Sequence, residues 1–78
     1  MAEMSKTEAN YLNKMIDHHT DAVVMSKKFL ADTTPSTRLA KVAELARAII
    51  DAQTSEITLM RKWLMEAGYD ADGNGGGM

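Results

Sequence analysis

The chain has 78 residues, of which 26% are charged, and its formal net charge at pH 7 is −2. This balance provides no basic surface for nucleic acid, and no apolar run approaches the roughly 18–20 residues that insert into a membrane. A chain this short is marginally stable alone, and because it has no cysteine, a metal ion or a second subunit must replace disulfide bonds.

The first predicted helix covers residues 5–31. Ser5 and Glu8 have the spacing of a capping box, in which two side chains bind free backbone N–H groups of the first turn. Apolar residues then recur every three or four positions, and we expect Asn13 on the opposite, polar face. Residues 1–4 are predicted to be flexible and do not resemble a signal peptide, which leaves a cytoplasmic location open.

A second predicted helix covers residues 35–67, with Thr34 as its N-cap and Pro35 at its first position. Gly68 suits the left-handed conformation that follows many helices. Because the break between the helices is short, they must be antiparallel, so residues 5–68 are predicted to form an all-α, antiparallel two-helix hairpin. Residues 69–78 are predicted to be a flexible, glycine-rich tail.

The second helix is apolar over an arc too wide for a single partner helix to cover. Two hairpins that associate would cover both apolar faces and form a four-helix bundle. The sequence therefore predicts a homodimer.

Polar and sulfur-containing side chains interrupt the apolar faces of both helices. In an antiparallel hairpin the two groups lie at similar depth, so we expect them to form one polar layer. On the first helix, helical angles place Met15 and His19 at the centre of the face and His18 and Met25 on its flank. The second helix contributes Gln53, Glu56 and Met60.

Three interpretations of this layer compete. Gln53 and Glu56 could accept hydrogen bonds from the histidines in a purely structural network that fixes the register of the bundle. Alternatively, imidazoles and thioethers could bind Cu(I) or Ag(I), with Gln53 or Glu56 orienting the histidine rings. Catalysis, with His19 as a base and Glu56 as its orienter, is the weakest interpretation, because the layer offers no serine or cysteine nucleophile. We therefore do not expect this protein to be an enzyme.

Two motifs carry a resemblance to a bacterial family. They are Met15-Ile16-x-His18-His19-x-x-Ala22-Val23-x-Met25 and Leu45-Ala46-x-x-Ile49-Ile50-x-x-Gln53-x-x-Glu56-Ile57-x-x-Met60-Arg61-x-Trp63-Leu64. Both motifs, in this order and with a proline-containing turn between them, resemble the CopM-like proteins of domain of unknown function three hundred and five. The resemblance covers residues 11–68.

The resemblance implies a ferritin-like four-helix bundle in a periplasmic or secreted protein that handles copper or silver. It implies Met15, His18, His19, Met25 and Met60 as metal ligands, with Gln53 and Glu56 as the polar pair that supports them. Many members carry two copies of the hairpin in one chain. This chain has one copy, so a homodimer would restore the four helices.

Overall fold

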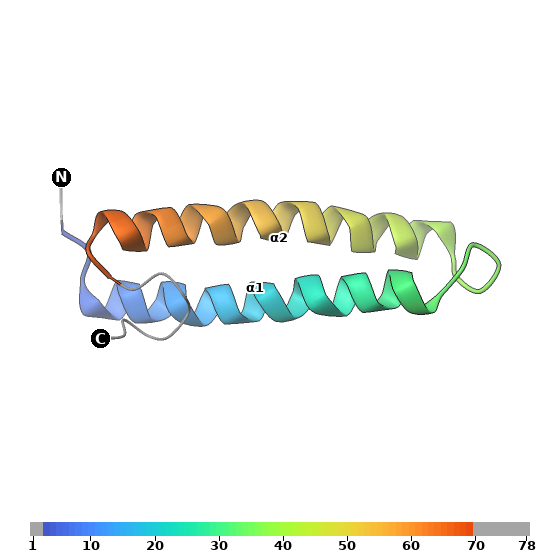
Figure 1. Ribbon diagram of the computed structural model, residues 1–78, viewed down its shortest axis with the longest axis horizontal. Helices are drawn as coiled ribbons and strands as arrows, with labels where there is room; N and C mark the ends of the chain where they lie inside the picture. The colour runs from blue at the N-terminus through green and yellow to red at the C-terminus, as the bar shows by residue number, and fades with distance from the viewer. Residues whose placement is uncertain (1–2, 70–78) are drawn as a thin grey trace.

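The computed structural model describes residues 3–69, which form an antiparallel pair of helices. Helix α1 spans Lys6–Asp32 and helix α2 spans Ala40–Glu66, and each has 27 residues. The two helices lie side by side along their whole length (Figure 1). The molecule measures 50 × 23 × 15 Å, so it is one helix layer thick. The predicted all-α hairpin is confirmed.

Both outer helix ends close as the sequence predicts. Ser5 N donates to Glu8 Oε1 at 2.9 Å and Glu8 N donates to Ser5 Oγ at 3.1 Å, which completes the capping box. After α2, Gly68 adopts a φ of 84°. The N–H groups of Gly68 and Tyr69 then donate to Met65 O at 3.1 Å and Leu64 O at 2.8 Å, a Schellman motif.

Residues at the edges of the predicted flexible segments contribute to packing. Met4 and Tyr69 both pack against the hydrophobic core, and the Tyr69 hydroxyl donates to Met4 O at 3.5 Å. Tyr69, the first residue of the predicted tail, thus packs against the core that contains Leu64, as a residue at this position of a Schellman motif often does. The rest of the tail, residues 70–78, lies outside the described residues, as do residues 1–2.

The second helix begins at Ala40 rather than at Pro35. Thr37 N donates to Thr34 O at 2.9 Å, and Thr34 N donates to Thr37 Oγ1 at 2.7 Å, so residues 34–37 form a closed turn. Pro35 occupies the second position of this turn, where its fixed φ is favourable. Thr34 therefore caps the turn and not the helix, and Leu39 precedes α2 without a side-chain cap.

The side chain of Arg38 binds backbone carbonyl groups at the end of α1. Its Nη1 donates to Leu30 O at 3.3 Å and to Thr33 O at 3.4 Å, which satisfies carbonyl groups that the end of a helix leaves free. This contact ties the turn back to α1.

The core lies toward the open end of the hairpin, away from the turn. Four buried residues form its centre, and half-buried side chains, including those of Leu12, Met15 and Ile57, pack around them. Near the turn the buried residues are small, so that the helices meet there through alanine and serine. The central four are Ala9, Ile16, Met60 and Leu64, and the small residues are Ser26, Ala43 and Ala46.

Asn13 was expected on the polar face but is only 2% exposed. Its Nδ2 donates to Ala9 O at 3.0 Å, while its Oδ1 has no hydrogen-bond partner among residues 3–69. The reason for the error is spacing, because Asn13 follows Ala9 by four positions and precedes Ile16 by three, and it therefore lies on the buried stripe.

Neither α1 nor α2 is long and apolar enough to cross a membrane.

Candidate functional site

The layer predicted from the sequence has one direct link between the helices. His19 Nε2, on α1, lies 2.5 Å from Glu56 Oε1, on α2. The His19 side chain is 11% exposed, whereas that of Glu56 is 57% exposed. The pairing of a histidine with Glu56 agrees with the expected convergence. However, Glu56 is not buried in the centre of an apolar face, because its carboxylate reaches His19 from the edge of the helix pair.

This contact defines what each ring nitrogen of His19 can do. Since Glu56 accepts from Nε2, the imidazole is in the tautomer that leaves Nδ1 with a free lone pair, or it is protonated at both nitrogens. A carboxylate that holds one ring nitrogen while the other binds a metal is a common arrangement in metal sites. The geometry around His19 therefore allows both a structural and a ligating role.

Two of the predicted sulfur ligands lie at the core beside this pair. Met60 is buried, with an exposed fraction of 7%, and Met15 packs against the cluster that contains Met60. On α1, Met15 precedes His18 by three residues and His19 by four, so both imidazoles lie one turn from its thioether. The structure thus brings Met15 and Met60 together at the core, with His19 one turn from Met15, whereas His18 is exposed at the same level of α1.

The structure does not bring Met25 into this region. Met25 lies seven residues after His18, which corresponds to about 10 Å along the helix. Both side chains are exposed, Met25 by 66%. They share one side of α1, but they cannot bind one metal ion within a single hairpin.

Gln53 is half-buried and makes no hydrogen bond to either histidine within residues 3–69. The same residues contain no group of three or more histidine, cysteine, aspartate or glutamate side chains that could hold a metal ion.

A further feature is an exposed apolar face that runs along both helices. On each helix its residues follow one another in alternating steps of three and four, the spacing of a coiled-coil seam. Many of its large side chains are exposed, including Tyr11 by 61%, Leu45 by 59% and Trp63 by 44%. We call this surface the apolar face; it comprises Tyr11, Met15, His18, Ala22, Met25 and Phe29 of α1, and Val42, Leu45, Ile49, Ala52, Glu56, Leu59 and Trp63 of α2.

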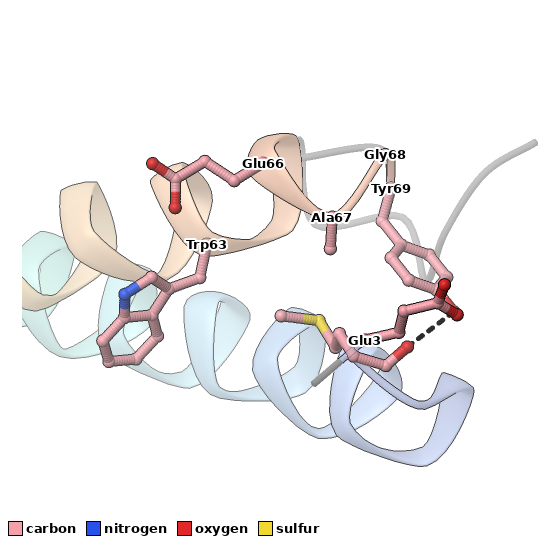
Figure 2. A pocket seen from close by; sticks show the side chains of 7 residues that line it. Glu3, Trp63, Glu66, Ala67, Gly68 and Tyr69 are labelled. Atoms are coloured by element: carbon pink, nitrogen blue, oxygen red, sulfur yellow. Dashed lines mark hydrogen bonds between the residues drawn. The ribbon is translucent and has the colours of Figure 1, made fainter. Parts of the chain in front are cut away.

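The two seams lie on the same side of the hairpin. Tyr11 of α1 and Trp63 of α2 line a common hollow of about 390 Å³. Trp63 and Met4 also border a larger hollow of about 520 Å³ at the open end, which Tyr69 closes on its far side (Figure 2). In this view the Trp63 ring and the Tyr69 ring stand at opposite walls, with Glu3 below and between them (Figure 2).

Helical angles from the sequence predict the wide apolar arc of α2 and the side of α1 that carries Tyr11, His18 and Met25, but they put Asn13 on the wrong face. The burial of Asn13 could have been found from its spacing to Ala9 and Ile16.

The fold and the His19–Glu56 pair define a class of protein: a single-layer helical hairpin with methionine and histidine side chains along one helix. A sequence model of one protein family, described as Domain of unknown function (DUF305), matches residues 8–77. The chain belongs to this family. No curated protein and no solved structure matches the chain.

Proposed function

We propose that this protein binds a soft metal ion, Cu(I) or Ag(I), for sequestration or resistance. The observation that carries the proposal is the position of Met15, one helical turn before both His18 and His19 and packed against the cluster that contains Met60. Thioether and imidazole donors at this spacing suit soft ions that accept few ligands. Glu56 supports the role of His19 by holding its Nε2, so that Nδ1 remains for the metal.

Met25 belongs to the proposal in a different position. Its thioether is exposed two turns beyond His18, where it could bind a metal ion arriving from solvent or complete a site between two hairpins. Gln53 would act only by orienting polar neighbours, since it is half-buried beside the layer.

The test is a competition titration with Cu(I) and a chromophoric chelator under reducing conditions. We expect Met15→Leu and His18→Ala/His19→Ala to weaken binding by at least tenfold. Met65→Leu is the matched control, because Met65 is also a methionine of an α-helix, is 63% exposed, and lies outside the proposed site. Equal affinity of wild type and all three variants would refute the metal site.

A second candidate function is a structural one, and the burial of His19 favours it. An imidazole 11% exposed and bound to a carboxylate of the other helix fixes the register of the hairpin whether or not metal is present. In this interpretation His19→Ala lowers the stability of the metal-free protein, and Cu(I) does not raise its melting temperature. A rise that disappears in Met15→Leu would exclude it.

We also propose that the protein is a homodimer. Domains are normally built from two packed layers, whereas this hairpin is a single layer 15 Å thick with an exposed apolar face. The residues of the apolar face span about 30 Å along the helices and the hairpin is 23 Å wide, a footprint on the order of 700 Å², and a stable dimer buries about 800 Å² of each partner.

Two residues of equal exposure test the homodimer. Leu45 lies on the apolar face and Val24 lies on the other side of α1, and each is 59% exposed. In sedimentation equilibrium, Leu45→Asp should shift the protein to monomer and Val24→Asp should leave it dimeric. A wild-type protein that remains a folded monomer at 100 times the concentration needed for detection would refute the dimer.

For location, we propose a periplasmic or secreted protein on the ground of the family resemblance, and the absence of cysteine is compatible with an oxidising compartment. Fractionation of cells that express the gene from its own start would test this proposal. We further propose that the protein is not an enzyme. The hollows described above lie at the open end of the hairpin, and the imidazole of His19 is packed against Glu56.

A further inference from the structure

Glu56 occupies an unusual position on the apolar face. It lies on the α2 seam between Ala52 and Leu59, where a buried apolar side chain is the rule. Its Oε1 contacts His19, but its side chain is 57% exposed, and no second hydrogen bond to Glu56 occurs within residues 3–69. An aspartate or glutamate at such a seam position would be costly to bury against another helix unless a cation or donor faced it.

A donor of this kind lies at the same level of the apolar face. The His19–Glu56 contact fixes the register of the antiparallel helices, so His18 lies beside the level of Glu56. His18 belongs to the seam of α1 and is exposed. Within one hairpin His18 and Glu56 stand on different helices and both face outward. They therefore offer one donor and one acceptor to whatever covers the face.

The same register pairs the other residues of the two seams by size. Toward the open end of the hairpin from His18 and Glu56, Tyr11 lies at the level of Trp63, and the two side chains line one hollow. Toward the turn, Ala22 lies at the level of Ala52, and both are small. Large, polar and small side chains therefore lie at matching levels on the two antiparallel helices. Such a surface is complementary to a second copy of itself that is rotated by 180° about an axis parallel to the helices.

We propose that a second copy of this chain docks on the apolar face with both turns at the same end, so that α1 of each copy packs against α2 of the other. This inference rests on the homodimer proposed above and specifies its geometry. The geometry differs from that of the ferritin-like bundle which the resemblance implies, because the one long crossover of such a bundle places the two hairpin turns at opposite ends. In it, the carboxylate of Glu56 has two partners: Oε1 binds His19 of its own hairpin, and the other oxygen accepts a hydrogen bond from the partner's His18. The four residues of this layer alternate acid and base around the bundle.

The alternative two-fold dimer, with turns at opposite ends, has a specific defect. It packs α2 against the α2 helix of the partner. Glu56 lies three residues beyond the middle of α2, so full overlap would place it about 9 Å along the axis from its own copy, at the level of the partner's Ile49 and Ala52. Neither of these apolar side chains donates a hydrogen bond, so the carboxylate of Glu56 would be buried with His19 as its one partner. Charge complementarity therefore favours turns at the same end.

Single cysteines distinguish the two geometries, because the chain has none of its own. Ala22→Cys and Ala52→Cys are prepared separately, mixed in equal amounts, allowed to exchange subunits and oxidised mildly. We expect a covalent dimer linked from position 22 to position 52, formed only in the mixture. A mixture of Val24→Cys with Ala52→Cys is the control and should give no such product, because Val24 lies on the other side of α1.

Failure of the geometry and failure of the dimer have different signatures. Cross-linking of Ala22→Cys alone, or a dimer in which the mixture does not cross-link, would overturn the same-end arrangement while the dimer itself stands. A monomer in sedimentation would overturn both proposals.

The contact between Glu56 and the partner's His18 has its own test. Glu56→Gln and His18→Ala should each raise the dimer dissociation constant at least fivefold, and the double variant should raise it by less than the product of the two. Glu44→Gln, an exposed position of α2 outside the apolar face, is the control and should have no effect. Strictly multiplicative effects of Glu56→Gln and His18→Ala would refute the contact.

Discussion

Asn13 gives the sharpest prediction about stability, because its polar side chain is 2% exposed and half satisfied. The Nδ2 group donates to Ala9 O, but Oδ1 has no partner among residues 3–69. An unsatisfied buried acceptor costs about 1–3 kcal/mol, whereas the single hydrogen bond contributes about 0.5–1.5 kcal/mol. The amide therefore stabilises the fold less than an apolar side chain of the same shape would.

We expect Asn13→Leu, which keeps the branching of the side chain, to raise the free energy of unfolding by about 1–2 kcal/mol. This figure combines relief of the buried carbonyl, loss of one hydrogen bond and a gain of a few tenths of a kcal/mol in helix propensity. Because methyl groups are bulkier than amide atoms, local overpacking takes back part of the gain. Asn13→Ala avoids overpacking and should be close to neutral.

Urea denaturation followed by circular dichroism, at one fixed protein concentration, measures these changes. Asn10→Leu is the matched control: Asn10 is exposed on the same helix one turn earlier, so only the propensity difference of a few tenths of a kcal/mol should appear. If both Asn13→Leu and Asn13→Ala lowered stability by 2 kcal/mol or more while the control did not, Oδ1 would have a partner that the substitutions remove, and the reasoning would be refuted.

Three further predictions concern the core and the helix ends. Leu64 is fully buried in the core, so Leu64→Ala should lower the free energy of unfolding by about 2–5 kcal/mol in the same urea assay. Gly68 has a φ of 84°, and nothing lies within 4 Å of an added Cβ, so Gly68→Ala should cost about 1 kcal/mol from backbone strain alone; an unchanged midpoint would contradict it. Hydrogen bonds from the Ser5 backbone N–H and the Ser5 side chain lower the pKa of Glu8 below 4.5. Because this pKa is lower in the folded state, Glu8 stabilises α1 at pH values above its unfolded pKa, and this stabilisation is lost as the pH falls through the folded pKa. In Glu8→Gln the free energy of unfolding should therefore fall less steeply as the pH is lowered. An identical fall in wild type and Glu8→Gln would refute the effect.

The sequence was sufficient to predict those parts of the fold that local interactions determine. The capping box at Ser5 and the left-handed Gly68 depend on a few neighbouring residues, and each appears as expected. The start of α2 was wrong for a related reason. Pro35 suits both the first position of a helix and the second position of a turn, and the choice was made by Thr37 and by Arg38, whose guanidinium binds the end of α1.

The position of the candidate site along the helices was predictable from the sequence, but the exposure of its side chains was not. Helical spacing placed Glu56 in the same polar layer as His19 but about one turn further along, and the structure shows the two side chains in contact. Spacing could not indicate that Glu56 reaches His19 from an exposed edge, because exposure depends on the angle between the helices rather than on position along either one. Asn13 is a second case in which exposure could not be predicted: its polar side chain was expected at the surface, but the packing of the two helices buries it.

The structure agrees with the division of the layer that helical angles predict, with His19 and Met15 toward the centre and His18 and Met25 on the flank. His19 is held by a carboxylate inside the hairpin, and Met15 and Met60 lie at the core, so these three are fixed by packing. His18 and Met25 are exposed on the apolar face, so their surroundings depend on what covers that face. If a second hairpin covers it, His18 is drawn toward the partner's Glu56 and away from Met15. Dimerisation and Cu(I) binding would then compete for one imidazole, and by linkage Cu(I) should weaken the dimer by the same factor by which the dimer weakens Cu(I) binding.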